Sequence, residues 1–332
     1  MAKGNVCFMT LLISLVVLTG CAPRAFRIEL VPTDQKLKET EIERDKGNFI
    51  RDKIAVIDVD GLLINKRRGG IMRDGENPVS LFVEKLDKAA SDRRVKAVVL
   101  RLNSPGGTVA ASDIMYHSLR EFKRNTGKPV IACILGVGCS GAYYLACGSD
   151  GILAQPGGVT GSIGTIMQTY SFAGTMEKIG VKAVSIKSGD LKDLASPLHD
   201  LRTEERQVLE GIINQFYEQF LTVVQKGRKK IGEQKLRELA DGRVYTAETA
   251  LQEKLIDRIG YPADGIEWAK ELAGIKKARV VIYHRPLGYR ANVYGSATSV
   301  DDAVGALINV ELPDWLTSNG TQFLYLWQPL VE

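Results

Sequence analysis

The sequence is poor in the side chains that most often carry catalysis or bind metals. Its 332 residues include three histidines and five cysteines, and no two cysteine clusters have the spacing of a metal site. Blocks of Lys and Arg interleaved with aromatic residues are also missing, and the formal net charge is only +5. These absences argue against a zinc centre and against nucleic-acid binding. We therefore expect no cofactor and no nucleic-acid partner.

The longest hydrophobic run lies at the N-terminus, where "VCFMTLLISLVVLTGCAP" closely follows Lys3. It has the length of a signal peptide and ends at small residues, and "LTGC" resembles the lipobox of bacterial lipoproteins. We predict a lipoprotein-type signal peptide over residues 1–20, lipidation of Cys21, and a lipid-anchored stalk over 21–50. An uncleaved membrane anchor and an ordinary secretory signal are the alternatives. All three place the folded part at the bacterial cell envelope, outside the cytoplasm.

Strands and helices alternate from residue 53 onward. Hydrophobic runs that end at turns predict strands, and apolar residues at helical spacing predict helices. The predicted strands lie at residues 53–61, 95–103, 130–136, 151–155 and 181–187, and the predicted helices at 78–90, 110–125 and 172–179. Such alternation is typical of a parallel sheet with crossover connections, so we predict an α/β fold. Strands that are apolar on both faces indicate a sheet covered on both sides.

The second half of the chain is predicted to add a long amphipathic helix and a small C-terminal extension. Apolar residues follow one stripe of residues 203–226, and residues 241–260 have the pattern of a small strand, a helix and a short strand. A strand is predicted over 278–283, after which the pattern becomes loop-like. We expect the folded domain over residues 51–275 and an extension of unknown role over 276–332.

Ser140, in "GCSGAYYLACGSD", lies where a predicted strand gives way to a helix. Its small neighbours Gly138 and Gly141 would let a substrate backbone approach, and the first helical turn would direct free N–H groups at the site. These features suit a serine nucleophile. Serine is also a favoured helix N-cap, so this segment alone leaves both interpretations open.

A second glycine turn, "NSPGG", follows the neighbouring predicted strand. Loops at the strand ends of a parallel sheet gather at one edge, so the glycine N–H groups could stabilise an oxyanion near Ser140. Pro-Gly-Gly is also an ordinary turn. Of the remaining cysteines, Cys133, Cys139 and Cys147 are expected to be small buried hydrophobic residues.

A serine nucleophile needs a base, and the histidines are poorly placed to supply one. His117 is on a predicted helix, His199 is in a loop and His284 is near the tail. A lysine can serve when it is neutral, since burial lowers the ordinary lysine pKa of ~10.4 by several units. The segment "KSGDLKDLASP" offers two candidates, Lys187 and Lys192.

Four segments in this order, "LRLNSPGG", "CSGAYYLA", "GVTGSIG" and "IKSGDLKDLASP", resemble signal peptide peptidase A, a family of membrane-bound serine–lysine peptidases. "LADGRVYTAETALQEKLIDRIG" is similar to that family's closing segment. The resemblance covers residues 50–265, and it implies a fold like that of Clp protease and crotonase, built from stacked ββα units. It implies that neither metal nor cofactor is needed.

The resemblance also assigns a role to each motif residue. Ser140 matches the family's nucleophile, and Lys192, 52 residues later, matches the general base. Ser162, in "TGSIG", matches a serine that positions the lysine amine, and Gly107 matches the donor of the oxyanion hole. Lys187 is left as a structural or surface charge.

The function implied is that of a membrane-associated serine endopeptidase that cleaves remnant signal peptides or other apolar, unfolded peptides. In the family, the serine and lysine of one site come from neighbouring protomers or from tandem halves. Each motif occurs once here, so the resemblance implies a ring-shaped homo-oligomer. The segment "FLYLWQP" resembles tails of some members and has no assigned role.

Three alternatives remain at this stage. A crotonase-like acyl-transfer enzyme would act on soluble thioesters, which an exported chain would rarely meet. A Clp-like Ser–His–Asp triad needs a histidine soon after the serine, and "QPGGVTGSIGT" contains none. A catalytically inactive scaffold of the same fold is opposed by the joint presence of Ser140, Ser162 and Lys192.

Overall fold

The computed structural model describes residues 36–66, 76–285 and 322–327. The predicted signal peptide and Cys21 lie outside these residues. In chain order, the first elements are β1 (Lys38–Arg44), β2 (Lys53–Asp60), α2 (Pro78–Ser91), β3 (Val95–Ser104), β4 (Gly106–Thr108), α3 (Val109–Thr126), β5 (Val130–Cys139), α4 (Gly141–Ala146), β6 (Gly151–Ala154) and β7 (Val159–Gly161). The later ones are α5 (Ala173–Lys178), α6 (Thr203–Gly227), α7 (Glu233–Leu239), β8 (Val244–Thr246), α8 (Ala247–Gln252), β9 (Arg258–Ile259), α9 (Pro262–Leu272), β10 (Arg279–His284) and β11 (Leu324–Leu326).

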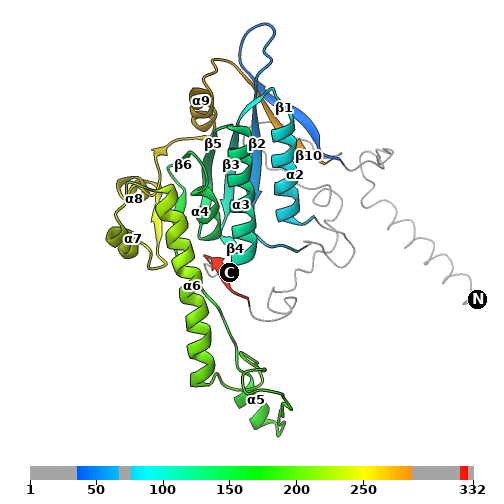
Figure 1. The fold of residues 1–332 in the computed structure, drawn as a ribbon, viewed down its shortest axis with the longest axis vertical. Coiled ribbons are helices and arrows are strands. Elements are labelled where there is room, and N and C mark those ends of the chain that lie inside the picture. Colours follow the sequence, from blue (N-terminus) through cyan, green and yellow to red (C-terminus); the bar gives the residue numbers. More distant parts are fainter. Residues whose placement is uncertain (1–35, 67–75, 286–321, 328–332) are drawn as a thin grey trace, which may run out of the picture. The chain divides into compact units, whose positions relative to one another are not determined.

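A central sheet organises the described part of the chain (Figure 1). Its main path runs in the order β1-β10-β2-β3-β5-β6-β9, and β7 and β8 join it through β5. The pairs β2–β3, β3–β5 and β5–β6 are parallel, with helices in the crossover connections. The predicted α/β fold is confirmed, and the parallel register brings the carboxyl ends of β3 and β5 to one edge.

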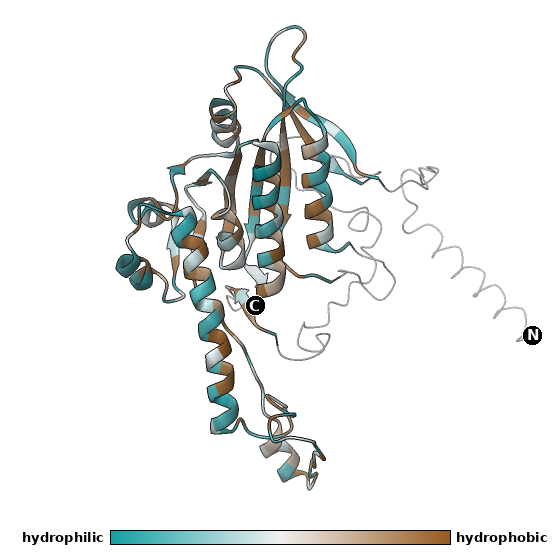
Figure 2. Ribbon diagram, in the orientation of Figure 1, coloured by the Kyte–Doolittle hydropathy of each residue, from teal (hydrophilic) through white to brown (hydrophobic). Residues whose placement is uncertain are grey.

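Both faces of the sheet are buried, as the apolar strands predict. One set of alternate residues, including Ile54, Val56 and Val99, packs with α9 around Trp268. The residues between them pack on the opposite face, in a larger core that includes side chains of α2, α3, α4 and α6. Figure 2 shows the hydrophobic colouring along the central strands. This two-sided burial makes the strands a rigid support for the loops at their ends.

Three predicted features differ in the structure. No strand forms over residues 181–187, whose side chains are almost all exposed, because β-branched residues form a strand only where a neighbouring strand pairs with them. Part of the predicted stalk is β1, which pairs antiparallel with β10. In the C-terminal extension the predicted strand over 278–283 is present as β10, and β11 is a further strand that was not predicted. Among the helices of the described ranges, none is both long and apolar enough to cross a membrane.

Candidate active site

Ser140 occupies the sharp turn between β5 and α4. It has φ +53° and ψ −116°, a combination outside the left-handed helical region that non-glycine residues sometimes visit. It sits at the N-cap position of α4, but its side chain makes no capping hydrogen bond. The helix therefore does not use the hydroxyl. Strained backbone of this kind persists where the surrounding structure fixes it, and it is concentrated at functional sites.

Ser162 lies beside Ser140 because of the register between β5 and β7. Cys139 pairs with Gly161 in this parallel ladder, so the two serines are the next residue on each strand. The Ser140 N–H donates to the Gly161 carbonyl at 2.7 Å, and the Ser162 N–H donates to the Arg243 carbonyl at 2.7 Å. Both serines are buried, and the β5–β7 register places them side by side.

The glycine turn after β3 lies against the same junction. The Ser104 hydroxyl donates to the Gly61 carbonyl at 2.5 Å and accepts from the Gly106 N–H at 3.1 Å, which holds the turn closed. A Cβ on Gly107 would lie 1.9 Å from the carbonyl oxygen of Leu63. A Cβ on Gly106 would lie 2.7 Å from the Gly141 nitrogen. Close backbone approach therefore requires glycine here.

The N–H of Gly107 is directed away from the main sheet. Leu63 makes a parallel bridge to Gly107, with hydrogen bonds from the Leu63 N–H to the Gly106 carbonyl and from the Thr108 N–H to the Leu63 carbonyl. The two hydrogen bonds to Leu63 are thus made by Gly106 and Thr108, the residues on either side of Gly107. The N–H of Gly107 itself therefore points to the other side of β4, away from Leu63. The Gly107 N–H therefore points to the edge along which β11 lies, next to Gly141, and it becomes available to an oxyanion only where β11 leaves that edge.

Strand β11 lies along that opposite edge. It pairs antiparallel with β4, placing Tyr325 opposite Gly107, and Leu324 makes an antiparallel bridge to Ile166 on its other side. The Tyr325 carbonyl oxygen lies 3.1 Å from the position that a Cβ on Gly141 would take. The chain's own C-terminal segment thus fills a strand position beside Ser140.

The side chain of Tyr325 fills an aromatic pocket. It is 0% exposed, its ring lies 5.2 Å from that of Tyr144 and 4.7 Å from that of Phe220 between centroids, and its hydroxyl donates to the Phe216 carbonyl at 2.6 Å. Burial raises the pKa of Tyr325 and of Tyr144 well above the usual tyrosine value. The C-terminal strand thus packs one large aromatic side chain against α4 and α6, next to the turn that carries Ser140.

Lys192 is not brought to Ser140 within the single chain. It is exposed, in the turn-rich segment between α5 and α6, where its N–H donates to the Gly189 carbonyl at 3.1 Å. Figure 1 places this segment at the opposite end of α6 from α4. The large hydrophobic residues around it, such as Val184 and Ile186, are exposed at 83% and 100%. The base assigned by resemblance therefore lies on an uncovered surface.

The histidines and cysteines do not enter the site. His117 is exposed on α3, His284 contacts the Thr40 hydroxyl at 2.7 Å, and His199 belongs to the segment that carries Lys192. Cys139 directly precedes the nucleophile but is fully buried, and burial raises its thiol pKa to about 12. It therefore stays a protonated, unreactive thiol. Cys133 and Cys147 are likewise free and buried.

Sequence reasoning missed two parts of this arrangement. The pairing of β11 with β4 joins residues more than 200 positions apart, and the short apolar run "FLYLW" carries no signal for that partner. The ion pairs around Lys192, which involve Lys187 and His199, were not expected either. A strained serine with an unused hydroxyl is suited to acyl transfer, and the Gly107 N–H beside it faces Tyr325 of β11.

Comparison with known proteins places these features in a family. The model of peptidase family S49 matches residues 122–276. A putative signal peptide peptidase SppA of Enterococcus faecium is 32% identical over 248 residues, which are 75% of this chain and 71% of that protein. A putative protease of Synechocystis sp. is 34% identical over 230 residues, covering 69% of this chain and 78% of that protein. The chloroplastic serine protease SPPA of Arabidopsis thaliana is 32% identical over 241 residues, 71% of this chain and 35% of that protein.

Proposed function

This chain belongs to the signal peptide peptidase A family, within peptidase family S49, and is a serine peptidase; we propose that it cleaves peptide bonds with a dyad of Ser140 and Lys192. The observation that carries the proposal is the conformation of Ser140, whose hydroxyl is left unused by α4 beside Ser162 and the Gly107 N–H. The assignment of Lys192 rests on the matching motif "SGDLKD".

The mechanism is acyl transfer in two steps. Neutral Lys192, with its amine oriented by the Ser162 hydroxyl, takes the proton from Ser140 as the serine oxygen attacks the peptide carbonyl. The Gly107 N–H stabilises the oxyanion of the tetrahedral intermediate. Lys192 then protonates the leaving amine, giving an acyl-enzyme. Water, deprotonated by the same lysine, hydrolyses this ester and restores Ser140.

The lysine comes from a neighbouring copy of the chain. Ser140 is 1% exposed, whereas Lys192 is exposed in the single chain, and exposure to water favours the charged form of an amine. A second copy that covers Lys192 would favour the neutral form and deliver it to the neighbour's serine. Such head-to-tail contacts close into rings when the rotation between copies permits.

Exposed apolar side chains support this assembly. Several lie between residues 170 and 198 on both sides of Lys192, namely Tyr170, Phe172, Ile179, Val181, Val184, Ile186, Leu191 and Leu198. Contiguous exposure of this kind is typical of surfaces that another protein covers. The unpaired residues 181–187, with their strand-like composition, would gain a partner in the same contact.

The substrate is an extended, apolar peptide. Strand β11 supports this class because it adds to β4 as a strand and places an aromatic side chain in the pocket beside Ser140. A substrate would use the same main-chain pairing. Signal peptides, which the name of the Enterococcus relative gives as its substrates, have this apolar character, and an N-terminal lipid or anchor would hold the enzyme at the membrane where their remnants stay.

A complementation experiment tests the dyad and its assembly together. Ser140→Ala and Lys192→Ala are each expected to lower kcat/KM on an apolar fluorogenic peptide by at least about 10⁴-fold. After subunit exchange, an equal mixture should recover about a quarter of the wild-type activity, because random assortment gives one functional pair in four. A fluorophosphonate adduct on Ser140, mapped by mass spectrometry, identifies the nucleophile.

Each part of the proposal has its own contradicting result. Full activity of Lys192→Ala would remove lysine as the base. No recovery after verified exchange of subunits, with both single variants inactive, would place the complete site within one chain. An adduct on another residue would remove Ser140 as the nucleophile.

A further inference from the structure

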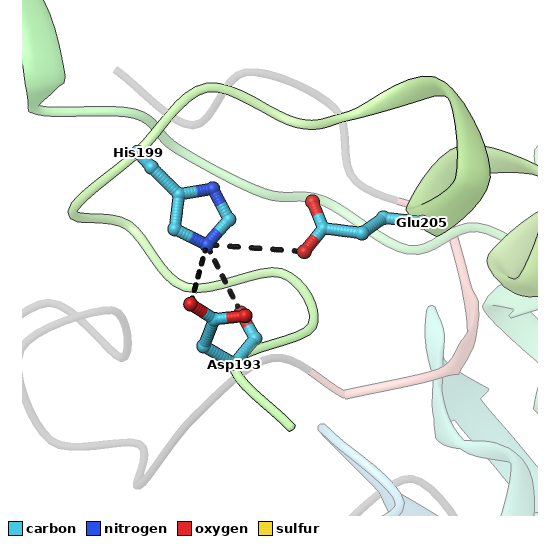
Figure 3. A group of neighbouring side chains, drawn as sticks. All are labelled: Asp193, His199 and Glu205. Carbon is cyan, nitrogen blue, oxygen red and sulfur yellow. Dashed lines mark hydrogen bonds and ion pairs between the residues drawn. The ribbon is translucent and has the colours of Figure 1, made fainter. Parts of the chain in front are cut away.

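Four charged side chains and one histidine surround the backbone that carries Lys192. We name this group the Lys192 clamp; its members are Lys187, Asp193, His199, Arg202 and Glu205. Figure 3 shows Asp193, His199 and Glu205 converging from the loop and from the first turn of α6. Their ligand-type atoms lie within 4.8 Å of one another. The group lies outside the site around Ser140, and the mechanism above gives it no role.

Asp193, the residue after Lys192, is the centre of the clamp. Its Oδ1 accepts from Lys187 Nζ at 2.6 Å and from Arg202 Nη2 at 2.9 Å, and its Oδ2 lies 3.4 Å from His199 Nε2. The Lys187 hydrogen bond is the main cause that lowers the pKa of Asp193 to about 2. The carboxylate is therefore charged throughout the working pH range and holds three partners.

The same partners also hold the main chain on both sides of Lys192. Lys187 Nζ and Arg202 Nη2 both donate to the Asp190 carbonyl, at 2.9 and 2.8 Å. His199 Nε2 lies 3.2 Å from the Asp193 carbonyl. The backbone is thus fixed two residues before Lys192 and one residue after it, while the Lys192 side chain itself stays exposed.

Helix α6 anchors the clamp. Glu205, 0% exposed, accepts from the Arg202 backbone N–H at 3.0 Å and from the Arg202 guanidinium. Figure 3 shows Glu205 entering the cluster from the start of this helix. Within residues 188–200 no side chain is fully buried, so these polar contacts, rather than an apolar core, define the loop conformation.

The chemistry of the clamp suits positioning and does not suit metal binding. Both carboxylates already face cations, because Arg202 pairs with Asp193 and Glu205, and Lys187 pairs with Asp193. A divalent ion at this point would have to displace or oppose two positive charges. An ion-paired network with directed hydrogen bonds instead fixes geometry.

We propose that the clamp positions the general base: Asp193 and its partners hold the backbone around Lys192 so that its amine is presented in one direction to Ser140 of the neighbouring copy. This inference rests on the proposed function. A general base must lie within hydrogen-bond reach of the proton it removes, and a displacement of 1 Å can cost about 100-fold in rate. Lys187 and Asp193 are therefore positioning residues and not catalytic residues.

The first test separates catalysis from binding. Asp193→Asn keeps the shape of the side chain and removes its charge, and we expect kcat to fall by about 10- to 100-fold while KM changes by less than about threefold. Glu204→Gln is the matched control, since Glu204 is an exposed carboxylate next to Glu205 in the first turn of α6 and is not part of the clamp. It should stay within about twofold of wild type. Wild-type kcat in Asp193→Asn would overturn the proposal.

The second test asks which subunit needs the clamp. In one mixture, Ser140→Ala/Asp193→Asn supplies the lysine and Lys192→Ala supplies the serine. In the other, Ser140→Ala supplies the lysine and Lys192→Ala/Asp193→Asn supplies the serine. We expect only the first mixture to lose activity relative to the mixture of single variants, by the same 10- to 100-fold. Equal losses in both would overturn the proposal, because they indicate a general defect of folding or assembly.

The two proposals fail in distinguishable ways. If the mixture of single variants shows no recovery, the inter-subunit site is wrong, and the kcat measurement on Asp193→Asn still decides whether the clamp matters. If recovery is normal and both clamp mixtures match it, the dyad stands and the clamp is overturned. Lys187→Met, which removes a different partner of Asp193, should reproduce the kcat loss if Asp193→Asn folds poorly.

Discussion

Ser140 and Lys192 lie in regions that different forces hold together. Around Ser140, backbone hydrogen bonds and the hydrophobic core fix each atom, and the residues from Cys139 to Ala146 are almost completely buried. Around Lys192, exposed apolar side chains surround a polar network on a loop without a core. The first region is buried within a single chain, whereas the second is exposed on its surface.

This difference indicates how such a site can be kept inactive before assembly. The residues proposed as nucleophile and oxyanion donor, Ser140 and Gly107, are built into the sheet edge. The proposed base, Lys192, is carried on a separate, exposed segment. Three further tests ask whether the region around Ser140 depends on backbone packing and apolar burial, and the region around Lys192 on charge.

The largest effect, measured as kcat/KM, is expected from a methyl group added to the backbone next to Ser140. Gly107→Ala would place a Cβ 1.9 Å from the Leu63 carbonyl oxygen, which forces β4 and its N–H to move, so kcat/KM should fall by about 100- to 1000-fold. The matched change in the region around Lys192 is Gly174→Ala in α5, where nothing lies within 4 Å of the new Cβ. It should leave kcat/KM unchanged. Equal losses in the two variants would break the comparison.

An intermediate effect is expected for apolar burial, measured as the free energy of unfolding in urea. Tyr325→Ala removes a fully buried ring from between Tyr144 and Phe220 and should cost about 3 kcal/mol. Ile186→Ala, at a side chain that is 100% exposed, should change the value by less than about 0.5 kcal/mol. Ile186→Ala should instead weaken self-association, measured by sedimentation. A larger loss of folding stability in Ile186→Ala than in Tyr325→Ala would contradict this assignment of the core.

The smallest effect is expected from the titration of His199. Both ring nitrogens face main-chain carbonyls, of Asp200 at 2.9 Å and Asp193 at 3.2 Å, and only the protonated ring donates to both. The Asp200 contact, together with Glu205 and Asp193, raises the pKa of His199 above its usual value, and these contacts outweigh the desolvation that lowers it.

Because the folded pKa is raised, the stabilisation from His199 is fully present below pH ~6.5 and is lost as the pH rises through the folded pKa. His199→Gln should therefore lower the Tm relative to wild type at pH 5.5 and have little effect at pH 8.5. A larger Tm loss at pH 8.5 than at pH 5.5 would show that the neutral ring is the stabilising form.

Local patterns predicted the parts of the fold that local physics determines. The spacing of apolar residues located α2, α3 and α6 to within a few residues, because each buries one stripe against the sheet. The run 181–187 was predicted as a strand and is not one in the structure, since strand formation depends on a partner that sequence spacing cannot supply. Strand β1 was missed for the converse reason, because β10 pairs with a charged segment.

In the candidate site, too, local motifs predicted some residues, whereas the positions of others depend on contacts between distant segments. Ser140, Ser162 and Gly107 follow strand ends, so their motifs located them and the parallel register brought them together. The position of Lys192 relative to Ser140 depends on a surface that one chain does not complete. The contacts of Asp193 and Arg202 depend on how a loop folds back onto α6, which periodicity does not encode.

The pairing of β11 with β4 has a consequence for any kinetic study of this enzyme. A free peptide that binds along β4 at Gly107 competes with β11, which is part of the same chain. The effective concentration of β11 at this edge is therefore set by its covalent connection and not by the amount of protein in solution. The apparent affinity of the peptide is therefore the intrinsic affinity multiplied by the fraction of time for which Tyr325 is away. KM values will therefore rank peptides by how well they compete with residues 324–326. A peptide that binds the uncovered β4 edge only weakly is missed by such a ranking.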